Sequence, residues 1–280
     1  MLPGLHTLPA TAPAHAWQVL RAGGFRLDGG GMFGLIPRTM WGQWVPYDAQ
    51  NRIGLAMNCV LLERAGQRIL VETGAGGKWT EKEAGMYEFT RQPDGAVRTV
   101  EHALAEVGVA PADISHVVVT HLHFDHAGGL TRPELVFPNA RVHVQRREWE
   151  DALANRSTMT RTYLRSHLDP IAGQVELHEG MAEILPGLWV APLLGHTWGQ
   201  QGVWWRDAAG VVSYTADLLP TVHHAHPASS LGYDMLPYDT MLTKRALLAK
   251  AEEEAWRLVL DHEPGPCVVR VAGARLHAQA

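Results

Sequence analysis

A short run of histidine and aspartate directly after an apolar segment constrains this chain more than any other feature. The segment 116–120, His-Val-Val-Val-Thr, has the composition of a buried strand. Four side chains able to bind metal follow within six residues: His121, His123, Asp125 and His126. Alternate residues of an extended chain share one face, so these groups can converge. Because one ion cannot comfortably take all four, the run predicts a centre with two divalent ions.

The types of ligand side chain limit which metals the site can bind. Imidazole and carboxylate suit zinc, and also iron, manganese and cobalt. Gly128 and Gly129 follow the run and would let the backbone pass close beneath the site. Solvent-exposed loop histidines are the alternative, but exposed loops rarely follow so apolar a strand with such regular spacing. We therefore expect two divalent ions per chain, with Zn²⁺ preferred over Mn²⁺, Co²⁺ or Fe²⁺.

Composition indicates one soluble globular domain spanning residues 1–280. Hydrophobic residues make up 46% and charged residues 19%, with a net charge of −5, which disfavours disorder and a nucleic-acid partner. The amino terminus lacks the pattern of a signal peptide, and no apolar run approaches the about 18 residues of a membrane span. We therefore expect a cytoplasmic protein that does not bind membranes. Cys59 and Cys267 lie outside every ligand-like motif and are expected to be reduced and buried.

Residues 1–50 differ from the rest of the chain. They are rich in Gly and Pro and predict an irregular arm that packs over the site or into a homodimer seam. Periodicity beyond it predicts strands at 57–63, 68–72, 114–120, 141–145, 187–194, 201–206, 211–215 and 257–260. Helices are expected at 100–107, 147–155 and 240–256, the last with Thr240 as its N-cap.

Three further ligands can be sought by the same rule, a His or Asp directly after an apolar run. His196 follows 190–194, Asp217 follows 211–216 and His262 follows 258–260. A lone residue of this kind is usually a cap or a hydrogen-bonded loop residue. Their occurrence together with the first cluster favours a shared metal site.

Taken in order, these motifs resemble the metallo-β-lactamase superfamily over residues 50–265. The resemblance implies an α+β fold, a four-layer αββα sandwich with the metal site on one edge. It further implies that His121, His123 and His196 hold the first ion. Asp125, His126 and His262 would hold the second, and Asp217 would bridge the two.

The closest likeness is to the branch of quorum-quenching N-acyl homoserine lactone lactonases and organophosphate hydrolases. It is carried by several segments: Gly31–Gly34, Ile69–Gly74, Phe137–Ala140, Glu148–Trp149, Asp217–Thr221 and Gly232–Pro237. Two departures stand out. Glu72 occupies the place of an aspartate that contacts a ligand histidine, and Pro220 that of a substrate-assisting tyrosine. His223 or His224 would have to supply the missing donor.

This branch implies a dinuclear hydrolase in which a metal-bridging hydroxide attacks an ester-like bond, most readily a lactone of the N-acyl homoserine type. A phosphotriesterase side activity is a further expectation. Asp125 is the candidate to carry the proton, with His224 as a second catalytic candidate. Two alternatives stay open. One is a thioester hydrolase of the glyoxalase II type, and the other is a persulfide dioxygenase with one iron.

The aromatic content of the arm suggests a pocket for the apolar part of a small-molecule substrate. Large apolar side chains line such sites around a few polar groups. The candidate lining residues are Met32, Phe33, Trp41, Trp44 and His223. Packing of these side chains across the sandwich or into the dimer seam is the competing interpretation.

Overall fold

The computed structural model describes residues 8–159, 161–273 and 275–278, whose strands form two sheets that face each other. The amino-terminal sheet has the strand order β1 (Ala16–Asp28), β2 (Arg52–Arg64), β3 (Gln67–Val71), β4 (His116–Val118), β5 (Arg141–Gln145) and β6 (Val175–His178). The carboxyl-terminal sheet has the order β13 (Arg275–Ala278), β12 (Val268–Ala272), β11 (Arg257–Val259), β10 (Gly210–Tyr214), β9 (Gln201–Asp207), β8 (Leu188–Pro192) and β7 (Ala182–Leu185).

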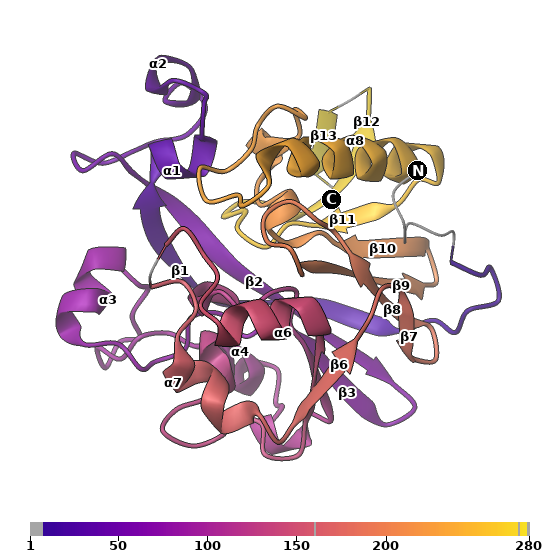
Figure 1. Ribbon diagram of the computed structural model, residues 1–280. Helices are drawn as coiled ribbons and strands as arrows, with labels where there is room; N and C mark the ends of the chain where they lie inside the picture. Colours follow the sequence, from indigo (N-terminus) through magenta and orange to yellow (C-terminus); the bar gives the residue numbers. More distant parts are fainter. Residues whose placement is uncertain (1–7, 160, 274, 279–280) are drawn as a thin grey trace.

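Helices cover the outer faces of both sheets. The α-helices are α1 (Gly29–Phe33), α2 (Arg38–Trp41), α3 (Glu81–Tyr87), α4 (Val100–Glu106), α5 (Phe124–Ala127), α6 (Arg146–Leu153), α7 (Arg165–Leu168) and α8 (Pro237–Glu253). Single turns of 3₁₀ helix are η1 (Pro111–Asp113), η2 (Gly128–Leu130), η3 (Asp169–Ile171), η4 (Ala216–Leu218) and η5 (Val222–His224). Figure 1 shows α8 on one side of the molecule and α4 and α6 on the other, with the sheets between them.

Three apolar layers hold these elements together. Between the sheets, Val71 and Val118 of the amino-terminal sheet pack with Trp205 and Tyr214 of the other. Helix α4 adds Leu104 to the outer face of the amino-terminal sheet. Helix α8 adds Leu247 and Ala251 to the outer face of the carboxyl-terminal sheet. The chain therefore has the expected four-layer αββα architecture.

Most elements predicted from periodicity are present. The hairpin β2–β3 turns at Ala65 and Gly66, both at positive φ, as a tight two-residue turn requires. Helix α8 begins at Pro237, three residues before the predicted Thr240, because proline is favoured in the first turn, where its missing N–H costs nothing. Both cysteines are buried and free, as expected. Within the described ranges, no helix combines the length and apolarity that crossing a bilayer demands.

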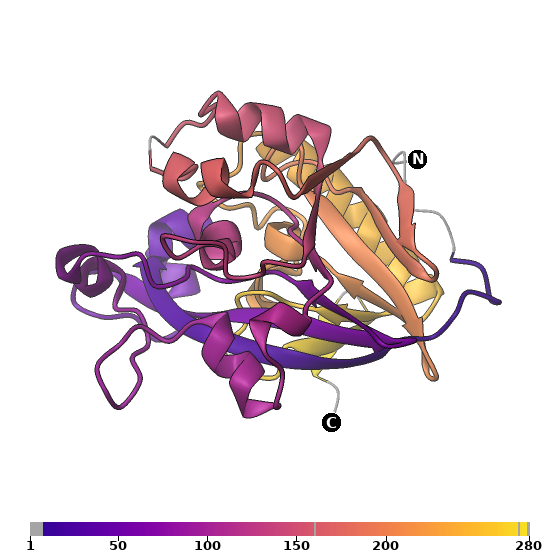
Figure 2. The same ribbon diagram turned by 90° about the horizontal axis from the view of Figure 1, so that it is seen from below.

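The prediction of an irregular arm over residues 1–50 is wrong for its central part. Ala16–Asp28 form strand β1, which pairs with β2 along its whole length and runs across the molecule in Figure 2. A register shift between Arg21 and Gly23 changes which face each side chain takes. That bulge and two adjacent glycines interrupt the alternation by which strands are recognised. Residues 1–7 lie outside the described part, and the homodimer seam and the 1–280 domain stay predictions.

Candidate metal centre and pocket

All seven predicted ligands lie at the ends of strands, along one edge of the sandwich. His121 and His123 follow β4, and helix α5 places Asp125 and His126 directly after them. His196 follows β8, Asp217 lies in η4 after β10, and His262 follows β11. A Cβ at Gly128 or Gly129 would collide with the carbonyl oxygens of Ala75 and Thr73, so only glycine permits this loop to pack closely.

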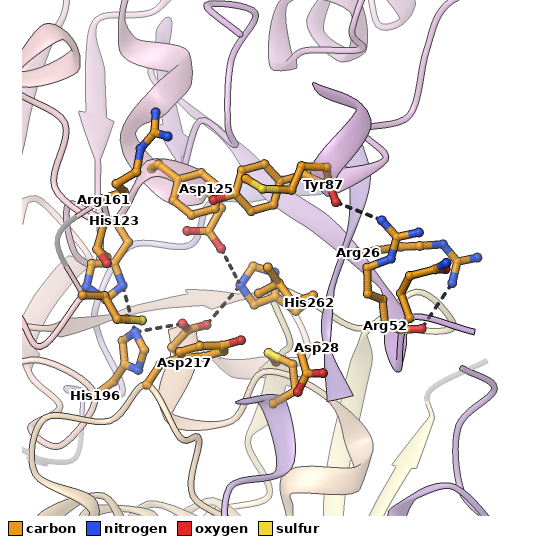
Figure 3. Close-up of a pocket in the computed structure, with 18 residues that line it drawn as sticks. Arg26, Asp28, Arg52, Tyr87, His123, Asp125, Arg161, His196, Asp217 and His262 are labelled. Atoms are coloured by element: carbon orange, nitrogen blue, oxygen red, sulfur yellow. Dashed lines mark hydrogen bonds and ion pairs between the residues drawn. The ribbon is translucent and has the colours of Figure 1, made fainter. Parts of the chain in front are cut away.

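Asp217 occupies the middle of the group, as Figure 3 shows. Its Oδ2 lies 3.0 Å from His196 Nε2 and 3.8 Å from His121 Nε2. Its Oδ1 lies 3.1 Å from His262 Nε2 and 3.7 Å from His126 Nε2. The two carboxylate oxygens thus face two different sets of histidines.

Donor atoms in the centre group into two sets. One atom each from His121, His123, His196 and Asp217 lie within 4.8 Å of one another. The second set joins His126, Asp217, Asp261 and His262 within the same limit. Asp125 Oδ2 lies 3.5 Å from His262 Nε2 and 3.9 Å from His126 Nε2, beside this second set.

Several buried polar atoms in these sets have no hydrogen-bond partner. They are His121 Nε2, His123 Nε2, His126 Nε2, Asp217 Oδ1 and Asp261 Oδ2. Burying an unsatisfied polar atom costs free energy. Five such atoms in one place therefore indicate that a binding partner belongs between them. Since all of them are nitrogen or oxygen donors to metals, the residues fit two divalent cations.

The pKa values of the histidines also support binding of metal cations at this centre. Burial and the neighbouring imidazoles hold the pKa of His121 and of His123 well below the usual value. Burial opposes a charge on His126 as well, but the carboxylates of Asp125, Glu72 and Asp217 raise its pKa to about 9. Without metal the carboxylates therefore draw protons onto some histidines. Metal cations would replace these protons as the positive charge of the centre.

A hydrogen bond to the other ring nitrogen orients most of the histidines. His121 Nδ1 lies 3.0 Å from Thr120 Oγ1, and His196 Nδ1 lies 2.9 Å from Asp234 Oδ1. His262 Nδ1 lies 2.8 Å from the Ala56 carbonyl oxygen. Partners of this kind fix the ring and leave the opposite nitrogen free for a metal.

Glu72 keeps the contact expected of the shorter aspartate. Its Oε2 lies 3.2 Å from His126 Nδ1, and its Oε1 accepts the Thr120 N–H at 2.7 Å. The residue has a φ of +67°, in the left-handed region, where the chain turns out of β3. One carboxylate thus ties a ligand histidine to the strand end that carries His121.

Glu148 braces two ligand loops at once. Its Oε1 accepts the Leu122 N–H and the Tyr163 hydroxyl, each at 3.0 Å. Its Oε2 accepts the Thr197 hydroxyl at 2.6 Å, next to His196. This buried carboxylate therefore sets the spacing between the loop of His121 and the loop of His196.

A cavity of about 470 Å³ opens above the centre, and its floor includes His123, His196 and His262. Its walls are largely apolar and include Leu27, Met32, Met86, Phe124 and Met159. Tyr87 and Tyr233 also line it. Figure 3 shows Arg26 and Arg52 on one side and Arg161 on the other. These arginines pair with Glu88, Asp48 and Glu83, so the rim carries both signs of charge.

Of the five residues predicted to line a substrate pocket, Met32 alone is among the residues that line this cavity, and its role in binding stays a prediction. Phe33 is stacked between Trp41 and His224, at 5.4 and 5.0 Å between ring centroids, and none of the three lines the cavity. Trp41 is buried because it closes over Gly29. Trp44 and His223 stack on each other outside the cavity.

The prediction of a catalytic His224 is not supported by its position. The side chain is fully buried, and its ring nitrogens meet Thr221 Oγ1 and the Met32 carbonyl oxygen, both at 2.8 Å. Burial lowers its pKa to about 3, so the ring is neutral. Both nitrogens are occupied, which leaves no donor for a substrate.

Sequence patterns missed the residues that act through other residues. Asp234 follows no apolar run, and the role of Glu148 depends on a loop 49 positions away in the chain. Tyr233 reaches the cavity from the segment before α8. Asp261 directly follows the apolar run 258–260, so the rule that found His262 could have found it as well.

Comparison with known proteins decides the family. Residues 53–262 match the model of the metallo-beta-lactamase superfamily. The chain belongs to this superfamily. Among curated members, N-acyl homoserine lactonase AiiA of Bacillus thuringiensis subsp. kurstaki is 31% identical over 173 residues, 59% of this chain and 64% of that protein. The alignment thus spans less than two thirds of this relative.

Solved structures extend the likeness to nearly the whole chain. A probable metal-dependent hydrolase from Staphylococcus aureus superposes with a TM-score of 0.88 and 25% identity, over 96% of this chain and 97% of that one. AidC, described as a dizinc quorum-quenching lactonase in complex with a product, gives a TM-score of 0.78 at 17% identity over 100% and 98%. At that identity the second likeness concerns the fold. This metallo-beta-lactamase superfamily member thus shares its fold with both proteins.

Proposed function

We propose that the protein is a dinuclear metal-dependent lactonase that hydrolyses N-acyl homoserine lactones. The observation that carries the proposal is the position of Asp217 between two sets of buried, unpartnered donors at the floor of an apolar cavity. The lactonase relatives support the substrate class. Zinc is the metal we expect. By hydrolysing acyl homoserine lactones, the protein would act as a quorum-quenching enzyme.

The ligands divide between two ions. His121, His123 and His196 would hold the first, Asp125, His126 and His262 the second, and Asp217 would contact both through its separate oxygens. When bound, such a pair of ions supplies an activated water and a Lewis acid. Asp261, with one unpartnered oxygen in the second set, is a further ligand candidate.

Asp125 is placed to move the proton. It lines the cavity, and its Oδ2 is 3.5 Å from His262 Nε2, at the boundary between the ligands and the substrate space. From there it can accept a proton from the attacking water and return it to the leaving alkoxide oxygen of the opened ring.

Tyr87 and Tyr233 offer the hydroxyl donor that Pro220 cannot supply. Both line the cavity that contains Asp125. Burial and nearby carboxylates raise the pKa of Tyr233 to about 12, and burial also raises that of Tyr87. Both phenols therefore keep their protons at neutral pH and can donate to a substrate carbonyl oxygen.

The apolar walls suit an acyl chain. Leu27, Met32, Met86 and Met159 come from three separate parts of the chain and surround the space above the metal ligands. A flexible thioether adapts to chains of different length. We therefore expect the lactone ring at the metals and the acyl chain among the methionines.

Metal quantification followed by kinetics tests the proposal. We expect two equivalents of zinc, manganese or cobalt per chain at the centre. The kcat/KM should be highest for an acyl homoserine lactone among lactones, phosphotriesters, thioesters and a β-lactam. A highest value on a thioester would instead identify a glyoxalase II-type enzyme. One equivalent of iron with oxygen uptake on a persulfide would overturn hydrolysis altogether.

A further inference from the structure

A second group of histidines crosses the amino-terminal sheet, outside the cavity over the metal centre. His116 of β4, His143 of β5 and His178 of β6 form a row of stacked imidazoles, here called the imidazole row. His116 Nδ1 lies 2.8 Å from His143 Nε2, and His143 Nδ1 lies 2.9 Å from His178 Nε2. The mechanism uses none of these residues.

Strand register brings a carboxylate to the same place. His143 is paired with Glu176 on β6, and Gln145 with His178. Alternate residues of a strand share a face, so Glu176 and His178 lie beside His143 on one side of the sheet. One donor atom from each of His143, Glu176 and His178 lies within 4.8 Å of the other two.

We propose that His143, His178 and Glu176 bind one divalent transition-metal ion, such as Zn²⁺, with His116 as hydrogen-bond partner of the ligand His143. Two imidazoles and a carboxylate are an established donor set for zinc and suit copper and nickel as well. Water would complete the shell.

The spacing of the nitrogens suits a shared ion. Two nitrogens about 2.0–2.1 Å from one tetrahedral zinc are about 3.3 Å apart. His143 Nδ1 and His178 Nε2 are 2.9 Å apart, so a small outward movement of an edge strand admits the ion. Strand β6 is the last strand of its sheet and can make that movement.

Protons compete weakly for these ligands. Burial and the neighbouring imidazoles lower the pKa of His143 to about 4, and burial also lowers the pKa of His116 and of His178. All three rings are therefore neutral near pH 7, and an ion would take the place of the hydrogen shared between His143 Nδ1 and His178 Nε2. The charged groups facing them are Glu176 and Arg141, which pair at 3.1 Å. Because Arg141 is exposed and Glu176 is half-buried, at a surface position, their pairing costs little to break.

The row also provides the outer hydrogen bond of a metal ligand. A ligating imidazole donates its second N–H to a neighbouring acceptor in most metal sites. If His143 binds through Nδ1, its Nε2 donates to His116 Nδ1 and the existing 2.8 Å contact is kept. His178 lines a surface hollow of about 210 Å³, which gives an ion a path from solvent.

Such an ion would join β5 to the edge strand β6. An unprotected edge strand invites pairing with other chains, and a crosslink to the neighbouring strand restrains it. The function is structural, and it does not depend on which ester the protein hydrolyses.

Zinc quantification after equilibrium dialysis tests the proposal on the full chain. We expect His178→Gln and Glu176→Gln to hold one zinc ion fewer than wild type, with at least about 100-fold weaker binding at this site and unchanged hydrolysis. His277→Gln removes a histidine remote from the row and should bind as wild type does. Asp217→Ala, which damages the catalytic centre, should keep the ion of the row, so the two sites fail independently.

Anomalous X-ray scattering at the zinc edge locates the ion. A peak between His143 Nδ1 and His178 Nε2 in wild type, absent in His178→Gln, is the expected result. Equal zinc content in wild type, His178→Gln and Glu176→Gln would overturn the proposal. A wild-type map with zinc at the catalytic centre only would overturn it as well.

Discussion

His121 of the metal centre and His224, which stacks on Phe33, are equally buried, yet their ring nitrogens meet different surroundings. His121 Nε2 has no partner, whereas both nitrogens of His224 are hydrogen-bonded. The partners of His224 are a hydroxyl and a backbone carbonyl oxygen, which gives this ring a packing role. His121 Nε2 instead faces other groups able to bind metal, Asp217 among them, which fits a ligand role. Burial does not distinguish these two histidines, but the groups that face their nitrogens do.

Removal of the central carboxylate should have the largest effect. Asp217→Ala takes away the group that faces both sets of donors, so metal content and turnover should fall together, with turnover lost almost completely. Elemental analysis and lactone kinetics on the same preparation measure both. Full dimetal occupancy with wild-type turnover would show that Asp217 does not bridge.

A more selective change separates metal binding from proton transfer. Asp125→Asn keeps an oxygen ligand but removes the base, so we expect metal to be retained and kcat to fall by about 10²-fold or more. Unchanged kcat at full metal content would rule out the proton role. His224→Gln serves as the contrast, because a packing histidine should leave kcat near wild type at neutral pH.

Glu72 acts on the centre through His126, so its effect should be intermediate. Glu72→Gln weakens the contacts to His126 Nδ1 and to the Thr120 N–H and should reduce metal affinity by about 10–100-fold. Competition with a chelator measures this loss. Glu63→Gln, at an exposed strand position, is the matched control. Equal affinities in both variants would contradict the orienting role.

His224 should reveal itself in the pH dependence of stability. Its pKa is about 3 in the folded protein and about 6.5 when unfolded, so the unfolded state binds the extra proton between these values. Stability is therefore full above about pH 6.5 and falls as the pH drops below it, by about 2 kcal/mol at pH 5.

Urea unfolding of metal-free protein at pH 8 and pH 5 tests this. His224→Gln cannot titrate, so its loss of stability on acidification should be smaller than that of wild type by about this amount. Identical losses would mean that His224 is not held neutral in the native protein.

The smallest effect concerns the cavity wall. If acyl chains bind against Met32, KM should fall as the chain lengthens. Each buried methylene would contribute up to about 0.8 kcal/mol to the binding free energy. Met32→Ala should flatten this dependence of KM on chain length. Trp41→Ala should lower the free energy of unfolding and leave the chain-length dependence unchanged. If the chain-length dependence changed only in the Trp41 variant, Trp41 and not Met32 would be the residue that contacts the acyl chain.

Local patterns in the sequence were sufficient to find the candidate ligands, because each lies next to its own signal. An apolar run predicts a strand, and a His or Asp just beyond it is positioned by that strand alone. The four-layer fold was predicted from the family resemblance that these same motifs carry. Strand β1 escaped detection because a bulge and Gly23-Gly24 disrupt its alternation.

Local patterns by themselves determined that this chain carries histidines and aspartates at strand ends, in clusters that could bind metal. Only the tertiary structure decided what each remaining polar or aromatic group does. Glu72, Glu148 and Asp234 act across long separations in the chain, and Phe33 and His224 meet from opposite ends of it. Whether a ring lines a cavity or fills a core depends on which neighbours occupy its faces and nitrogens, and those neighbours come from distant segments that only folding brings together.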